Sequence, residues 1–183
     1  MVSNAERRAL VAGEPQIVPR ITDIYAALPA ITGKFELEYE GELRGADNVA
    51  RDIIRAAVGT VFNGSFANAD LRQVTEWFDL GGTLQIDDTL PAAELIARAG
   101  EVQGLRELAM SAGIDRKASP PLTASAIDFV LEGLYAQKKI SRSDEFNYQS
   151  AEPPRRPAPR GLQTEPNFER EIPNVGSKKK YYN

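Results

Sequence analysis

Apolar residues recur with helical spacing over most of the first 140 residues. The longest run lies between Gly45 and Asn63, where apolar side chains follow the i, i+3, i+4 rhythm without a break: Ala46, Val49, Ala50, Ile53, Ile54, Ala57, Val58, Val61 and Phe62. This stripe predicts an amphipathic helix with one buried face. Two acid–arginine pairs fall on its other side at spacings of weak surface contacts, Asp47 with Arg51 and Asp52 with Arg55.

Shorter helical runs follow and are separated by glycines and prolines. They cover residues 71–78, 90–99, 105–112 and 127–135. We expect Asp88 or Thr89 to cap the helix at 90–99. At the N-terminus, Ser3 to Glu6 has the spacing of a capping box and predicts a helix that ends at Gly13. A second short helix is predicted from Arg20 to Leu28, with Pro29 ending it.

The only strand pattern is the alternation of apolar and acidic residues over 35–40, which predicts a short β-hairpin or an extended arm near 34–42. Four carboxylates share this stretch: Glu36, Glu38, Glu40 and Glu42. Carboxylates can gather Mg²⁺ or Ca²⁺. Four like charges on one strand face are more typical of a solvated edge that discourages aggregation, which is the interpretation we favour.

Residues 144–183 contain half of the prolines and few apolar side chains. A stretch of this composition buries too little apolar surface to offset its chain entropy, so we predict a disordered tail. Its end, 178–183, is expected to be a solvated terminus rather than a docking motif. The fold class is therefore all-α, with about six to seven short helices, the hairpin or arm, and the tail.

Composition excludes several kinds of chemistry. The 183 residues include no Cys and no His, so Cys/His zinc sites, disulfides and His-activated nucleophiles are excluded. Residues 1–140 hold 14 Lys and Arg against 20 Asp and Glu, which argues against a nucleic-acid partner. We find neither a membrane-spanning apolar run nor a secretory leader, and therefore expect a soluble cytoplasmic protein with no membrane partner.

Several longer segments resemble one family. They are 2–14 (VSNAERRALVAGE), 18–42 (VPRITDIYAALPAITGKFELEYEGE), 46–58 (ADNVARDIIRAAV), 77–82 (WFDLGG) and 127–142 (IDFVLEGLYAQKKISR). In this order they resemble the helical lid and C-terminal extension of magnesium-chelatase-like AAA+ ATPases. The resemblance implies a partial lid at 1–33, a helical extension domain at 34–143, and the tail at 144–183.

The resemblance also implies partners and cofactors. Members of the family use ATP and Mg²⁺, work as rings of AAA+ subunits, and in magnesium chelation act with an integrin-type (von Willebrand A) protein. This chain departs from the family pattern because the α/β core is missing, and with it the Walker A phosphate loop and the Walker B acidic motif. Whether the chain belongs to an enzyme is open, and alone it is expected to bind neither cofactor tightly and to hydrolyse no ATP.

The family lid carries an arginine that senses the γ-phosphate of the nucleotide, and we expect its position to lie upstream of Met1. Arg7 and Arg8 are the fallback candidates within the chain. A guanidinium can hold a phosphate through two hydrogen bonds. On spacing alone, both arginines are ordinary surface charges.

Two functions are therefore predicted. In the first, the chain is a C-terminal fragment of such an ATPase and contributes lid motion, oligomer contact or target contact to ATP-driven remodelling or metal insertion. In the second, it is a free-standing helical module that binds proteins without ATPase activity. An exposed apolar patch on residues 1–28 would favour the first function. A metal-dependent enzyme built on the acidic stretch is the least favoured alternative.

Overall fold

The structure is a computed structural model that describes residues 1–115, 117–143 and 146–151, with side chains omitted at 40–42. Its helices are α1 (Val2–Ala12), α2 (Ile21–Tyr25), α3 (Leu28–Thr32), α4 (Tyr39–Arg44), α5 (Ala46–Phe66), α6 (Arg72–Asp79), α7 (Ala92–Ala99), α8 (Leu105–Met110) and α9 (Pro120–Ala136). Three short strands complete it: β1 (Leu84–Gln85), β2 (Ile140–Arg142) and β3 (Asn147–Ser150). The predicted mainly helical fold class is confirmed.

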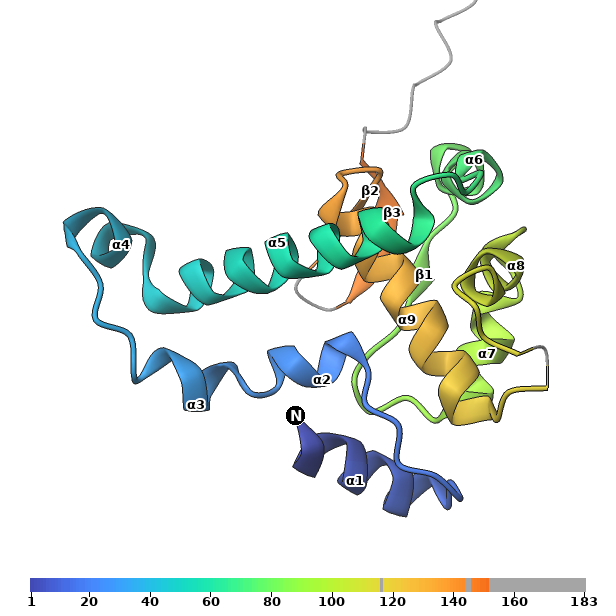
Figure 1. Cartoon of the computed structure of the whole chain (residues 1–183), viewed down its shortest axis with the longest axis horizontal. Helices are drawn as coiled ribbons and strands as arrows, with labels where there is room; N and C mark the ends of the chain where they lie inside the picture. Colours follow the sequence, from blue (N-terminus) through green and yellow to red (C-terminus); the bar gives the residue numbers. More distant parts are fainter. Residues whose placement is uncertain (116, 144–145, 152–183) are drawn as a thin grey trace, which may run out of the picture.

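Helix α9 is the centre of the main hydrophobic core. It is buried on nearly all sides, as expected of a helix whose apolar residues are not confined to one stripe. Helix α5 crosses it on one side, and α7 and α8 pack against it on another (Figure 1). The core joins side chains from α5 to β3, from Phe62 to Tyr148. The amphipathic helix predicted for α5 is confirmed, but its buried face is narrower than the predicted stripe, because Ile53, Ala57 and Val61 are exposed. Phe62 packs with α9 in the main core, whereas Ala50 packs with Tyr25 and Leu28 in a second, smaller cluster.

A small antiparallel sheet covers one end of α9. Its strand order is β1-β3-β2, with Leu84 opposite Tyr148 and Ile140 opposite Ser150. Tyr148 is completely buried. Residues 147–150 were predicted to belong to the disordered tail, and for them that prediction is wrong because the strand pairs on both sides. Residues 152–183, including the end at 178–183, lie outside the described residues.

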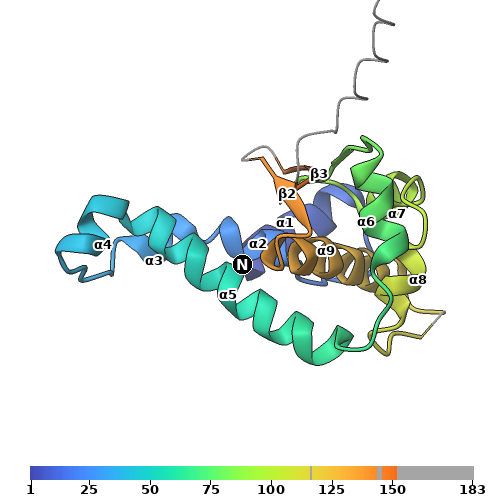
Figure 2. The same ribbon diagram turned by 90° about the horizontal axis from the view of Figure 1, so that it is seen from above.

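Helices α3 and α4 and the first half of α5 project from the rest of the molecule as an arm (Figure 2). A strand at 35–40 is not formed: 35–38 is irregular, and α4 begins at Tyr39. The alternating pattern has no neighbouring strand with which to exchange backbone hydrogen bonds, so the chain does not stay extended. Glu36 and Glu38 are exposed. The side chains of Glu40 and Glu42 lie outside the described part.

Prolines begin helices here where the sequence pattern suggested interruptions. Pro29 lies in the first turn of α3, and Pro120 and Pro121 begin α9. The first turn needs no backbone N–H from these positions, and the fixed φ of proline suits it. Helix α9 therefore starts seven residues before the predicted run at 127–135. Helix α1 ends at Gly13, as predicted, and Gly13 adopts the left-handed conformation with φ 63°.

Helix α7 receives its cap from a distant part of the chain. Neither Asp88 nor Thr89 caps it, because the residue before the helix is Pro91. The Ala92 N–H donates instead to Glu14 Oε1 at 2.6 Å. Asp87 accepts hydrogen bonds from the Thr89 N–H and hydroxyl, which closes the preceding turn. In the part of the chain described, no helix is long and apolar enough to cross a membrane.

Candidate functional site

Arg8, one of the two arginines singled out by the sequence, is buried inside the molecule. Its side chain is 2% exposed and forms a bidentate salt bridge with Asp23, in which Nη1 lies 2.5 Å from Oδ1 and Nη2 lies 3.0 Å from Oδ2. The same guanidinium donates to the carbonyls of Val18 and Asp88 at 3.0 and 3.1 Å. The expectation of an ordinary surface charge is therefore wrong for Arg8. Its donors hold α1 against α2 and against the loop before α7.

Arg7 points the other way. It is exposed, and its guanidinium donates to Asn4 Oδ1 at 2.9 Å, one turn earlier on α1. This is a short-range surface contact that a ligand could replace at little cost. Of the two candidate arginines, Arg7 is the one whose guanidinium an outside phosphate could reach. The structure does not bring Arg7 and Arg8 together on one surface.

A second arginine, Arg20, is buried close to Arg8. Arg20 Nη1 donates to the Leu90 carbonyl at 2.6 Å, while no partner among the described residues contacts its Nε and Nη2. Burial, followed by the nearby positive charge of Arg8, lowers the pKa of Arg20. Sequence reasoning missed this residue because its partner carbonyl lies 70 residues away.

Asp128 of α9 lies in the same buried region. Its Oδ2 accepts a hydrogen bond from the Thr22 N–H at 3.1 Å, and its Oδ1 has no partner among the described residues. Burial, followed by the negative charge of Glu132, raises the pKa of Asp128 to about 7. The carboxyl group is therefore poised to change its charge near neutral pH.

One turn further along α9, Glu132 is the acceptor of a buried cluster. It accepts hydrogen bonds from the Tyr148 hydroxyl at 2.5 Å, from the Tyr25 hydroxyl at 3.0 Å, and from the guanidinium of Arg142. Burial lowers the pKa of Arg142, but the charge and hydrogen bond of Glu132 together with the charges of Tyr148 and Tyr25 outweigh it, and the pKa is raised. Burial and the charge of Glu132 raise the pKa of both tyrosines as well. The cluster joins α2, α9 and the sheet.

The N-terminal segment carries several exposed apolar side chains. Of the eleven large hydrophobic side chains exposed in the described structure, five lie in the first 17 residues: Met1 at 47%, Val2 at 56%, Leu10 at 81%, Val11 at 85% and Ile17 at 53%. We call these five the N-terminal apolar face as a group name, although they do not all lie on one side of α1: Val2 and Val11, nine residues apart at about 100° per residue, point in opposite directions. Met1 also borders a groove of about 300 Å³ whose other walls are largely apolar and come from α2 and α9. This exposure is the feature that the sequence associated with a missing partner domain.

The described residues offer little to a metal. Within 1–115, 117–143 and 146–151, no three Asp or Glu side chains come together in a group that could hold one. Phosphate, by contrast, would find exposed guanidiniums on Arg7 and in a pocket next to Arg142. Comparisons with protein-family models, with curated proteins and with solved structures found no match. Membership of the AAA+ family therefore stays a prediction from the sequence.

Proposed function

We propose that residues 1–143 act as the lid and helical extension of a magnesium-chelatase-like AAA+ ATPase and seat on an α/β nucleotide-binding core. The observation that supports this is the N-terminal apolar face, because such a concentration of exposed apolar side chains is typical of a surface that another domain covers. The buried bonds of Arg8 and Arg20 tie the helices behind this face to the rest of the molecule. Motion of the face would therefore be passed on as a rigid-body rotation.

In this proposal the chemistry belongs to the core. ATP and Mg²⁺ bind there, and this chain supplies no catalytic group. Arg7 is placed as the nucleotide-sensing residue, because its guanidinium is exposed on the same helix as the N-terminal apolar face. The partners are other AAA+ subunits in a cytoplasmic ring and an integrin-type (von Willebrand A) protein.

A free-standing helical module that binds proteins is the second candidate. The main core supports it, because it is built entirely from residues between Phe62 and Tyr148 and needs no outside side chain to fill it. The N-terminal apolar face would then be the binding surface for a partner protein. Both functions use the same face, so one experiment can separate them.

The experiment mixes the full chain with the purified α/β core of a magnesium-chelatase-like ATPase that lacks its own lid. Sedimentation velocity measures association, and phosphate release measures ATP turnover. We expect no turnover above background from the chain alone, a complex with the core, and turnover in the mixture. Arg7→Ala should lower turnover and leave association intact. Reproducible turnover by the chain alone would contradict the proposal.

Two matched variants test the surface itself. Leu10→Asp places a charge on the N-terminal apolar face at a side chain that is 81% exposed, and should abolish association. Leu80→Asp makes the same change at a side chain that is 90% exposed but lies after α6, and should not. Failure of the chain and the core to associate would refute the lid function. Association without turnover would favour the interaction module.

A further inference from the structure

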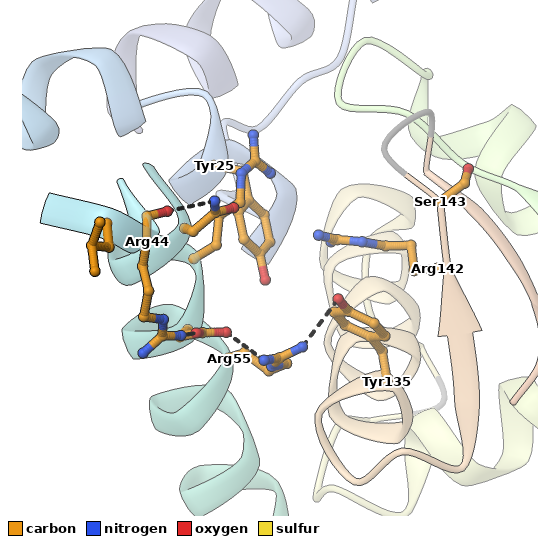
Figure 3. Close-up of a pocket in the computed structure, with 10 residues that line it drawn as sticks. Tyr25, Arg44, Arg55, Tyr135, Arg142 and Ser143 are labelled. Atoms are coloured by element: carbon orange, nitrogen blue, oxygen red, sulfur yellow. Dashed lines mark hydrogen bonds and ion pairs between the residues drawn. The ribbon is translucent and has the colours of Figure 1, made fainter. Parts of the chain in front are cut away.

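A pocket of about 540 Å³ lies between α4, α5, α9 and β2 and is lined by four arginines: Arg44, Arg51, Arg55 and Arg142. We call it the arginine pocket. Figure 3 shows Arg142 and Tyr135 on one side of it and Arg44 on the other, with Tyr25 and Arg55 reaching between them. Its volume falls in the range of sites for small molecules. It lies on the arm side of the molecule and does not involve Arg7 or the N-terminal apolar face.

The charged side chains that line the arginine pocket are mostly positive, whereas those of the surrounding molecule are mostly negative. Acidic residues outnumber basic ones over residues 1–140, yet the side chains that line this one cavity include four arginines and a single carboxylate, Asp52. A concave surface lined by one sign of charge focuses the electric field and raises the local concentration of counter-ions. Asp47 and Glu132, which pair with Arg51 and Arg142 from outside the lining, reduce the excess, but four guanidiniums against three carboxylates still leave the cavity positive in an acidic protein.

Arg142 is the lining residue of the arginine pocket whose side chain is held in one position. Its side chain is 6% exposed and is held by the buried carboxylate of Glu132. The guanidinium carbon lies 4.4 Å from the centre of the Tyr25 ring, 4.8 Å from that of Tyr135 and 5.0 Å from that of Phe146. Contacts of this kind between a guanidinium and aromatic faces are attractive. The group is oriented before any ligand arrives, so little conformational entropy is lost on binding.

The other three arginines are held loosely at the rim. Arg51 lies 3.6 Å from Asp47, its partner one helical turn earlier, and both side chains are at least 40% exposed. Arg44 and Arg55 both contact the carboxylate of Asp52, and these side chains are at least 35% exposed. Exposed ion pairs contribute little to stability. An incoming anion can therefore replace the carboxylates without destabilising the fold.

We propose that the arginine pocket binds a small, multiply charged phosphate compound, such as diphosphate or an ester with two phosphoryl groups. The rigid fork of a guanidinium matches two phosphate oxygens at once. Arginines face the cavity from opposite sides, from α4 and α5 on one and from β2 on the other, so two linked phosphoryl groups fit them better than one (Figure 3). Asp52, contacted by two of the guanidiniums, marks where one anionic group would lie.

The test is calorimetric titration of the full chain with diphosphate and with inorganic phosphate at matched ionic strength. We expect saturable binding of diphosphate at one site, at least about tenfold tighter than that of phosphate. Arg51→Ala should weaken diphosphate binding about tenfold or more, since a charge-assisted hydrogen bond is lost. Asp52→Asn should strengthen it, because a competing carboxylate is removed. A nucleoside diphosphate and a sugar bisphosphate, titrated in parallel, distinguish the free anion from its esters.

Arg72→Ala is the matched control, because Arg72 is an exposed arginine paired with Asp70 outside the arginine pocket. It should leave diphosphate binding unchanged. Circular dichroism of each variant checks folding, and Asp52→Asn still tests the site if Arg51→Ala does not fold. No saturable diphosphate binding at millimolar concentration would overturn the proposal, and so would equal losses in Arg51→Ala and Arg72→Ala. None of these measurements uses an AAA+ core, so this site and the proposed function can fail separately.

Discussion

Gly133→Ala tests the contact that sets α5 against α9 and so fixes the walls of the arginine pocket. A Cβ atom built at Gly133 falls within 2.6 Å of three atoms of the Phe62 ring. Carbon atoms that are not bonded prefer a separation of about 3.5–4.0 Å. Phe62 is 2% exposed and is stacked on Phe66 with ring centres 4.6 Å apart, so its ring has no free space to move into. One of the two helices must therefore shift.

The net cost follows from two opposing effects. Overpacking a core by one methyl group costs about 1–3 kcal/mol. Replacing glycine by alanine inside a helix stabilises the helix by about 0.8–1.0 kcal/mol. We therefore expect Gly133→Ala to lower the free energy of unfolding by up to about 2 kcal/mol. Gly64→Ala is the matched control, because Gly64 lies within α5 with no atom within 4 Å of a Cβ built there, and this variant should gain about 0.5–1 kcal/mol.

Urea unfolding followed by Trp77 fluorescence measures both variants, since this single tryptophan packs against the main core. The two substitutions are chemically identical, so opposite signs can come only from their surroundings. In a Phe62→Leu background the smaller side chain should reduce the cost of Gly133→Ala. Equal stabilisation by Gly133→Ala and Gly64→Ala would refute the close crossing of α5 and α9.

Two further changes test the buried polar groups. The pKa of Asp128 is raised to about 7 from an ordinary value of about 3.9, so the stability that its neutral form provides is complete below about pH 4 and is lost as the pH rises through 7. In Asp128→Asn, the free energy of unfolding should lose up to about 4 kcal/mol of this pH dependence. Urea unfolding from pH 4 to 8 measures it, and a pH profile identical to that of the unchanged protein would contradict the prediction. Glu14→Ala removes the acceptor of the Ala92 N–H and should cost about 1 kcal/mol, whereas Glu14→Gln keeps an acceptor and should cost less. Equal losses from both, measured by the same unfolding assay, would count against a capping role.

The sequence predicts those elements whose pattern is decided locally. The helix predicted at α5 and the end of α1 at Gly13 are both correct, because periodicity and a glycine C-cap act within a few residues. The apolar stripe overstates the buried face of α5, since Ile53, Ala57 and Val61 are exposed. The three strands were missed because each has four residues or fewer, which is too short for alternation to be seen. The strand predicted at 35–40 failed for the opposite reason: the alternation is present, but no partner strand lies beside it.

Long-range partners explain what the sequence could not predict about the candidate sites. Arg51 and Arg55 were interpreted as half of weak surface pairs, and these pairs do form. Nothing in their spacing indicates that Arg142, about 90 residues later, lies across the same cavity. Arg8 was interpreted as a surface charge because its partner carbonyl at Asp88 is 80 residues away. Burial of a charged side chain is decided by such pairings and not by its neighbours in the chain.

Three of the hydrogen bonds that attach the N-terminal helices join side chains of one segment to main-chain atoms of the other. Arg8, Arg20 and Glu14 supply side chains, but they bind the Asp88 carbonyl, the Leu90 carbonyl and the Ala92 N–H. A substitution scan through 88–92 would leave these main-chain atoms in place and would not detect this part of the joint. Ala92→Pro is the informative exception, since proline removes the N–H that Glu14 accepts. The receiving loop is constrained in other ways, because the Leu90 and Ala92 side chains are buried in the main core and Asp88 Oδ2 accepts a hydrogen bond from Asn4 Nδ2 at 3.0 Å. A redesign that keeps this joint therefore holds Arg8, Arg20 and Glu14 constant together with these three loop positions.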